Sequence, residues 1–285
     1  MQKFRNHLHW YFLGVLLVST IFIWYAVVAE DRGGKLTVAF LDVGQGDAIF
    51  IESPTGNQLL IDGGPNQSVL RALGKMMPFY DRSIDMLVVT NPDKDHFAGF
   101  IDVLRAYRVS SVVEPGTVGA SSEYRIFEDT VEQEKSARVL ARRGQHIDLG
   151  GGAMLEILFP DRDVAGLETN MGSIVARLTY GTTAFLLTGD SPEAVEKYLV
   201  LLDGKHLRSD VLKVGHHGSK TSTGEELLGF VAPSLAAISA GKNNRYGHPH
   251  QETLERLARF AVPIFGTYEQ GTIVMESDGE KVKVR

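Results

Sequence analysis

Apolar residues occur along most of the chain in short runs that alternate with amphipathic segments. The first runs are strand-like and predict strands at 36–43, 47–53 and 57–63. Further strands are predicted at 86–90, 110–116, 153–159, 172–180, 183–188, 210–215 and 235–239. Helices are predicted between them at 67–77, 97–107, 121–143, 192–202, 224–230 and 250–261, followed by a hairpin-like tail. Because the first strands precede a regular strand–helix alternation, we expect a layered α/β protein.

The N-terminal segment departs from this pattern. Residues 10–29 carry no formal charge, and a helix of that length would rise about 30 Å, enough to cross a hydrocarbon core. Lys3 and Arg5 before it predict a transmembrane signal anchor at 10–29, with residues 1–9 in the cytoplasm and the rest outside it. The membrane is then a partner through 10–29, and residues 30–35 form a linker. The alternatives are cleavage after Ala29, which gives a secreted protein, and a buried helix.

Composition excludes several classes of function. The 285 residues are 44% hydrophobic and 22% charged, which is typical of a globular protein and not of a disordered chain. The net charge of −6 provides no broad cationic surface for capturing nucleic acid. The sequence has no cysteine. Any metal must therefore be held by His, Asp, Glu or Asn.

The densest group of polar residues is 91–96, Asn-Pro-Asp-Lys-Asp-His, directly after the strand predicted at 86–90. It provides four side chains that can bind a metal: Asn91, Asp93, Asp95 and His96. Donors packed this closely repel one another unless a cation or solvent compensates. A polar helix cap is the alternative, because Asn, Asp and Pro all favour the start of a helix.

Three later strands are also followed by polar residues. Asp190 follows the strand at 183–188, His216 and His217 follow the strand at 210–215, and His248 comes after the strand at 235–239. One such residue has an ordinary explanation as a helix cap. Ligands in α/β proteins bind beyond the carboxyl ends of strands, so four strand ends of this kind predict a shared site.

Six motifs in a fixed order extend this pattern over most of the chain. They are FLDVGQGDA (40–48), LLIDGG (59–64), VVTNPDKDHFAGF (88–100), FLLTGD (185–190), VLKVGHHGSKTS (211–222) and RYGHP (245–249). They resemble the metallo-β-lactamase fold superfamily, and within it most the C-terminal hydrolase-like domain of ComEC-type DNA-uptake (competence) proteins. The resemblance implies that residues 36–285 form a four-layer αβ/βα sandwich with a metal site at the edge of its two sheets.

The resemblance also implies metal ligands. Asp95 and His96 match ligands of one metal site, and Asp190 matches the carboxylate that bridges two metals. The late histidine ligand is matched by His216 and, less well, by His217. These residues would hold one or two divalent ions, Zn²⁺ or Mn²⁺.

Asn91 departs from the resemblance, because the superfamily usually has His at this first ligand position. Asp93 matches the third position of the same motif. An amide oxygen is a weaker ligand for zinc than imidazole is. We therefore expect the first metal site to be weak, absent or suited to a harder ion such as Mn²⁺.

Further residues are implied around the ligands. Asp62 would support the ligand loop, Gln45 and Asp47 would form a tight loop beside it, and His248 would contact the substrate or leaving group. Asn170 lies where relatives carry an active-site Asn, and Ser219 is a nucleophile candidate without the usual sharp turn.

These inferences predict a membrane-anchored, extracytoplasmic metal-dependent hydrolase that acts on phosphodiesters, DNA included. Asp95, Asp190 and His248 are the predicted catalytic residues. The alternative is a non-catalytic exported binding or accessory module that keeps the fold with a metal site impaired by Asn91. ComEC-type proteins have many membrane segments, so a role in DNA uptake would require a separate channel protein.

Overall fold

The computed structural model describes residues 8–30 and 33–285, and the chain divides into two compact units, residues 1–34 and 35–285. The first unit contains one long helix, α2 (Leu8–Glu30). A transmembrane helix needs about 20 consecutive apolar residues. Among the described residues, we find no helix with both the length and the apolar character to cross a membrane. By this criterion the predicted anchor at 10–29 and the membrane localisation inferred from it are wrong.

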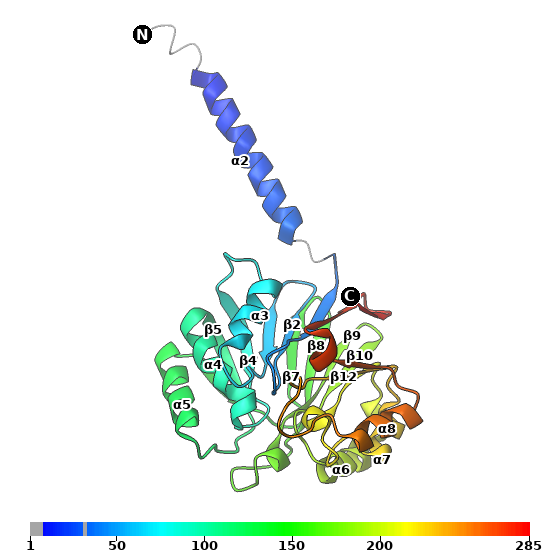
Figure 1. The fold of residues 1–285 in the computed structure, drawn as a ribbon. Coiled ribbons are helices and arrows are strands. Elements are labelled where there is room, and N and C mark those ends of the chain that lie inside the picture. The colour runs from blue at the N-terminus through cyan, green and yellow to red at the C-terminus, as the bar shows by residue number, and fades with distance from the viewer. Residues whose placement is uncertain (1–7, 31–32) are drawn as a thin grey trace. The chain divides into compact units, whose positions relative to one another are not determined.

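The second unit contains two β-sheets (Figure 1). The strands of the larger sheet are β1 (Leu36–Phe40), β2 (Ile49–Glu52), β3 (Gln58–Ile61), β4 (Ser83–Val88), β5 (Arg108–Glu114), β6 (Ala137–Leu140), β14 (Ile273–Ser277) and β15 (Val282–Val284). Their order across the sheet is β15-β14-β1-β2-β3-β4-β5-β6. The neighbours from β3 to β6 pair in parallel, and the other neighbours pair antiparallel.

The second sheet has a similar mixture of directions. Its strands are β7 (His146–Gly150), β8 (Ala153–Phe159), β9 (Val175–Tyr180), β10 (Thr183–Leu187), β11 (Val211–Lys213), β12 (Leu235–Ile238) and β13 (Ile264–Gly266), in the spatial order β13-β12-β11-β10-β9-β8-β7. Strands β10 to β13 are parallel. Their carboxyl ends therefore lie along one edge of the sheet.

Helices cover the outer faces of both sheets (Figure 1). Those on the larger sheet are α3 (Ser68–Met76), α4 (Lys94–Ala106) and α5 (Ser122–Glu134). Those associated with the second sheet are α6 (Glu193–Asp203), α7 (Glu225–Val231) and α8 (Gln251–Arg259). Short helical turns complete the unit: η1 (Asn170–Gly172), η2 (Gly204–Leu207), η3 (Gly215–Gly218) and α9 (Thr267–Gln270).

The side chains form three hydrophobic cores, which define four layers. Along β2, Phe50 belongs to the core beneath α3, α4 and α5, whereas Ile49 and Ile51 belong to the core between the two sheets. Along β10, Phe185 faces the core between the sheets and Leu186 faces the core beneath α6, α7 and α8. Successive strand residues point to opposite faces, so strands that are buried on both faces are apolar throughout. The predicted α/β class, with two sheets and helices outside them, is confirmed.

One predicted helix is too long. Helix α5 ends at Glu134, where Lys135 adopts a left-handed conformation with φ of 60°, whereas the sequence predicted a helix over 121–143. Residues 137–140 form the exposed edge strand β6 instead, and 146–150 form β7. Strand β6 is held by backbone pairing with β5 and by Arg138, which donates hydrogen bonds to Glu114. Both contacts are tertiary, and a local pattern does not reveal them.

Candidate metal centre

Four strand ends bring polar side chains to one place. Asp62 follows β3, His96 lies in the first turn of α4 after β4, Asp190 follows β10, and His217 lies in η3 after β11. All four residues are almost fully buried. Three of these strand ends, those of β4, β10 and β11, are among the four that the sequence predicted to share a site, and the fourth predicted residue, His248 after β12, borders the hollow above them.

His96 is held in one orientation by the residue that follows β3. Its Nδ1 lies 2.8 Å from Oδ2 of Asp62, whose two carboxylate oxygens also accept hydrogen bonds from the backbone and the hydroxyl of Thr90. Nδ1 therefore donates its proton to Asp62, and Nε2 is left to face Asp190 at 3.0 Å. A carboxylate behind a histidine in this way fixes the ring and its tautomer for metal binding.

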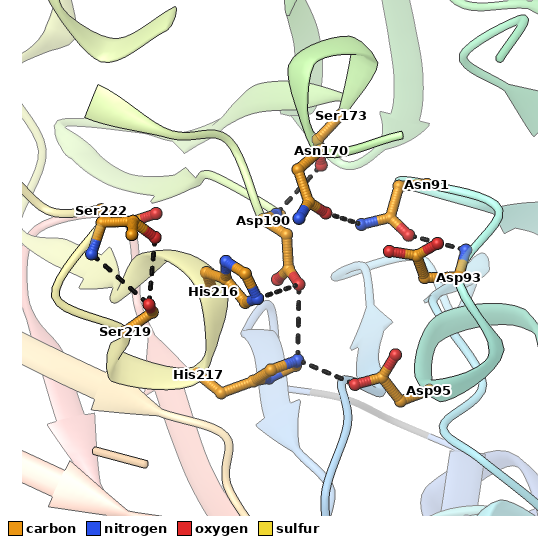
Figure 2. Close-up of polar contacts among 12 residues, drawn as sticks. Asn91, Asp93, Asp95, Asn170, Ser173, Asp190, His216, His217, Ser219 and Ser222 are labelled. Atoms are coloured by element: carbon orange, nitrogen blue, oxygen red, sulfur yellow. Dashed lines mark hydrogen bonds and ion pairs between the residues drawn. The ribbon is translucent and has the colours of Figure 1, made fainter. Parts of the chain in front are cut away.

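His217 presents its ring to the same place through an unusual backbone. His216 and His217 both have positive φ, 46° and 54°, a conformation that is strained for residues other than glycine. Nδ1 of His217 lies 3.0 Å from the carbonyl oxygen of Ser239, so it can donate there. Nε2 then points toward Asp95 and Asp190, as Figure 2 shows.

We name Asp95, His96, Asp190 and His217 the imidazole cluster, and their spacing fits a metal ion. Donors arranged tetrahedrally at about 2.0–2.1 Å from zinc lie about 3.4 Å apart. Oδ2 of Asp190 lies 3.0 Å from Nε2 of His96 and 3.5 Å from Nε2 of His217, and the latter lies 3.3 Å from Oδ2 of Asp95. Despite this proximity, neither Nε2 atom makes a hydrogen bond with correct geometry to any described residue. Buried polar atoms rarely stay unpartnered, so the cluster fits a divalent cation.

The charges of the cluster compensate one another. Burial alone would lower the pKa of His96, but the Asp190 and Asp62 carboxylates outweigh it and hold that pKa well above its ordinary value. Burial would also lower the pKa of His217, but the Asp190 and Asp47 carboxylates have the larger effect and raise that pKa to about 10. Burial would raise the pKa of Asp190, yet His217 and His96 hold it well below its ordinary value. Protons on the rings thus provide the positive charge that a cation would otherwise bring.

Sequence reasoning missed Lys213, a fully buried lysine at the end of β11. Its Nζ contacts Oδ2 of Asp47, donates a hydrogen bond to the carbonyl oxygen of Gly189 at 2.9 Å, and lies 3.8 Å from Oδ1 of Asp190. A charged residue inside the otherwise apolar run Val211–Val214 is the signal that could have revealed it. Lys213 balances the carboxylates on the side of the cluster away from solvent.

The loop before β2, which contains Gln45 and Asp47, contacts the loop that carries Asp95, as the resemblance implied. The backbone N–H of Asp47 donates to the carbonyl oxygen of Asp95 at 3.2 Å. A Cβ atom on Gly46 would lie 2.3 Å from that same oxygen, so only glycine fits there. The contact places the Asp47 carboxylate 3.2 Å from Nδ1 of His217. Asp47 therefore supports the ring of His217 rather than facing the open site.

The first ligand position is arranged differently. The Asn91 side chain donates from Nδ2 to Oδ1 of Asn170 at 3.2 Å, and its Oδ1 accepts the backbone N–H of Asp93 at 2.8 Å (Figure 2). We name Asn91 and Asn170 the amide pair. The Asp93 carboxylate accepts a hydrogen bond from Thr169 at 3.1 Å. Asp93 stands at the N-terminal cap of α4 but its side chain accepts no cap hydrogen bond, so the loop is not simply a helix cap.

The remaining predicted residues fall at different distances from the cluster. His216 reaches Oδ2 of Asp190 only at 3.6 Å and is 28% exposed, so the geometry favours His217 as the ligand where the sequence favoured His216. His248 borders the hollow above the cluster together with Gln45. Ser219 lies apart from it, bonded through its hydroxyl to Thr221. Ser219 therefore has no place in this site.

Comparison with known proteins agrees with this geometry. Residues 41–242 match the metallo-beta-lactamase superfamily. The chain is 32% identical over 278 residues to ComE operon protein 3 of Bacillus subtilis (strain 168), covering 91% of this chain and 35% of that protein. It is 31% identical over 249 residues to Recombination protein 2 of Haemophilus influenzae (strain ATCC 51907 / DSM 11121 / KW20 / Rd), covering 86% of this chain and 29% of that protein.

The chain thus spans about a third of the length of these curated relatives. Among solved structures, the metallo-beta-lactamase fold protein YhfI from Bacillus subtilis has the same fold, with a TM-score of 0.53 at 11% identity over 81% of this chain and 96% of that chain. The chain therefore belongs to the metallo-beta-lactamase superfamily, and the two curated relatives described above are competence proteins of the ComEC type.

Proposed function

We propose that this chain is a metal-dependent phosphodiesterase that holds one divalent cation, Zn²⁺ or Mn²⁺, in the imidazole cluster. Members of the superfamily are generally metal-dependent hydrolases. The observation that carries the proposal is the convergence of two buried, unpartnered Nε2 atoms on the Asp190 carboxylate. Nothing in the packing of a purely structural domain requires that arrangement.

The residues around the cluster have separable roles. A divalent cation in such a site lowers the pKa of a coordinated water and offsets charge that develops on a phosphoryl oxygen. His96 and His217 would hold the cation, with their rings fixed by Asp62 and Ser239. Asp95 is 31% exposed and can accept a proton at the mouth of the site.

His248 is suited to the leaving group. It borders the hollow above the cluster, and its ring lies 5.6 Å from that of His216. Burial, followed by the neighbouring rings of His217 and His216, lowers the pKa of His248 to about 4. The ring is therefore neutral near pH 7 and can donate one N–H to an oxygen of the substrate.

The shape of the site favours a small reacting group. The hollow above the cluster has a volume of about 160 Å³, which accommodates a phosphodiester but little more. With a net charge of −6, the chain offers no general attraction for polyanions. Affinity for the substrate would therefore come from the metal site and from the residues directly beside it. A nucleic acid, DNA included, can present such a diester to a narrow site where the nucleic acid is single-stranded.

The alternative is a non-catalytic binding or accessory module. The amide pair favours it, because Asn91 and Asn170 satisfy each other where a first metal would need ligands. This alternative would keep the fold and a single bound ion without turnover.

The test is turnover by the full chain of bis-p-nitrophenyl phosphate and of single-stranded DNA with added Mn²⁺ or Zn²⁺. We expect turnover that needs the added ion and that falls below detection in Asp190→Ala, since this variant removes the oxygen shared by both rings. Asp129→Ala, an exposed aspartate on α5, is the matched control and should keep wild-type rates. A chain that binds the ion yet turns over neither substrate would refute the enzyme and leave the binding module.

A further inference from the structure

A second hollow adjoins the metal site. It has a volume of about 560 Å³ and is bounded by the loops at 43–45, 65–66 and 244–246 and by the first residues of α4 at 94–95. It shares Gln45, Asp95 and Tyr246 with the smaller hollow above the imidazole cluster. A molecule whose reacting group enters the small hollow therefore continues directly into the larger one.

An aromatic platform forms one wall of this second hollow. Tyr246 as a whole residue is 49% exposed, and its ring stacks on His248 with ring centres 5.8 Å apart and an interplanar angle of 23°. The Arg245 guanidinium lies 4.8 Å from the centre of the same ring and donates to its hydroxyl at 2.7 Å. Tyrosine rings and guanidinium planes are the surfaces on which unpaired bases stack.

The platform is held in place by its own loop. Oδ1 of Asn244 accepts the backbone N–H groups of Tyr246 and His248, both at 3.1 Å, and its Nδ2 donates to the carbonyl oxygen of Gly241 at 2.9 Å. The Gly241 N–H in turn donates to Oε1 of Gln45 at 3.0 Å. An exposed aromatic side chain on a braced loop loses little entropy when a ligand stacks on it.

Two buried polar atoms at the junction of the hollows lack partners. Nε2 of Gln45 and Nδ1 of His248 make no hydrogen bond to any residue in the described ranges. The bond from Gly241 to Oε1 fixes the Gln45 amide, so the unpartnered end is a donor. This unpartnered N–H of Gln45 lies between the metal site and the larger hollow. It can donate a hydrogen bond to an oxygen of a ligand that extends from the metal site into the larger hollow.

The charge of the second hollow differs from that of the metal site. Lys94 and Arg245 border it, beside Asp95. Lys94 is already paired with Glu123 at 2.6 Å, so Arg245 is the cation with no carboxylate partner among the described residues. In a chain of net charge −6, a cation at this position favours an anionic group directly next to the reacting diester.

We infer that the second hollow binds one nucleotide of a single-stranded nucleic acid, next to the diester that reaches the metal site. Its base stacks on the Tyr246–Arg245 platform, and its phosphate lies near Arg245 and the Gln45 amide. This inference rests on the proposed function, which places the diester in the small hollow. It adds a second binding position beside the metal site, one that holds the base of the neighbouring nucleotide.

The test is binding of two fluorescein-labelled tetramers, (dT)₄ and its fully abasic counterpart, to the full chain in EDTA, where no cleavage occurs. Wild-type chain should bind (dT)₄ more tightly. Tyr246→Ala should weaken (dT)₄ binding about 5- to 150-fold, the range for loss of one base–aromatic stack, and should leave abasic binding unchanged. Tyr246→Phe should stay near wild type, because the ring is kept.

Two further variants complete the test. Tyr80→Ala removes a tyrosine that is 56% exposed outside both hollows and serves as the matched control. Arg245→Gln should reduce the slope of log K against log salt by about 0.7, the value for one phosphate contact on a single strand. Circular dichroism of each variant verifies folding.

Each result has a separate meaning for the two proposals. Equal binding of (dT)₄ and abasic tetramer by wild type, or equal binding by wild type and Tyr246→Ala, overturns the nucleotide subsite even if bis-p-nitrophenyl phosphate is hydrolysed. Base-dependent binding that Tyr246→Ala removes supports the subsite, and an absence of turnover with either ion would then overturn only the catalytic proposal.

Discussion

The imidazole cluster and the amide pair lie side by side at the same sheet edge, yet they satisfy their polar atoms in opposite ways. In the cluster, the Nε2 atoms of His96 and His217 face carboxylate oxygens without hydrogen-bond geometry. In the pair, Asn91 uses both ends of its amide, one toward Asn170 and one toward the backbone of Asp93. The first arrangement needs a proton or a cation, and the second needs neither.

Because of this difference, the two metal positions expected from the superfamily are not equivalent in this chain. Carboxylates and imidazoles gain by sharing a cation, whereas two amides that hydrogen-bond each other would have to break that bond first. We therefore expect one ion per chain. Three substitutions and the pH dependence of metal binding test this difference between the imidazole cluster and the amide pair.

The largest effect is expected from Lys213→Met. Lys213 is the buried cation behind the cluster, and removing it leaves the Asp47 carboxylate buried without its nearest positive partner. Breaking a buried pair in this way costs about 3–5 kcal/mol. Urea unfolding of the metal-free chain should show a loss of that size. Lys197→Met, at a lysine whose side chain is 58% exposed, is the control, and an equal small loss in both variants would count against the role of Lys213.

Asp62→Asn should have the next largest effect. The variant keeps the size of the side chain but removes the negative charge that orients His96. Metal affinity should fall about 10- to 100-fold, as it does when an outer partner of a metal-binding histidine is lost. Competition with a chelating dye measures this. Unchanged affinity would show that His96 does not hold the ion.

The pH dependence of stability and of metal affinity distinguishes the imidazole cluster from the amide pair. Despite the opposing effect of burial, Asp190 and Asp47 raise the pKa of His217 from its ordinary 6.5 to about 10. The protonated ring thus stabilises the metal-free chain fully below pH 6.5, and this contribution is lost as the pH rises through about 10. A cation must displace the same proton, so its apparent affinity should increase with pH in this window.

Calorimetry in two buffers of different ionisation enthalpy measures that displacement. We expect the release of up to two protons per ion, one from each ring, because the pKa of His96 is raised as well. A binding heat that is the same in both buffers would mean that the rings are not the ligands. An ion bound by amides would release none.

The smallest effect on stability is expected when Asn91 and Asn170 are both replaced by His. The variant loses the hydrogen bond between the two amides, which is worth about 1 kcal/mol. It offers two imidazoles beside Asp93, and a second ion per chain should then bind. Asn91→His alone is the intermediate control and should raise occupancy of the first position only partly. A double variant that still binds one ion would show that more than the amide pair limits this position.

The sequence predicted the fold through strands that are apolar on both faces and end in polar residues, such as β10 before Asp190. It failed at residues 137–140, where tertiary contacts decide the structure. Residues 137–140 look helical in isolation, but they pair with β5 as an edge strand. Residues 10–29 are helical as part of α2, yet no described helix meets the criterion for a membrane span.

The sequence likewise predicted one part of the candidate site and missed another. The order of the motifs placed Asp95, His96 and Asp190 correctly beside one another. The motif order did not reveal which of His216 and His217 points into the site. That depends on two consecutive positive φ angles, which turn the ring of His217 inward. It also did not reveal that Asn91 and Asn170 face each other, since 79 residues separate them in the chain.

The number of metal ions bound per chain shows whether one or both metal positions are functional. Purified full-length chain, equilibrated with Mn²⁺ or Zn²⁺ and freed of unbound ion, can be analysed by inductively coupled plasma mass spectrometry. We expect one ion per chain, which Asp190→Ala loses and Asp129→Ala retains. No bound ion in wild type, two ions in wild type, or one ion that survives Asp190→Ala would contradict it.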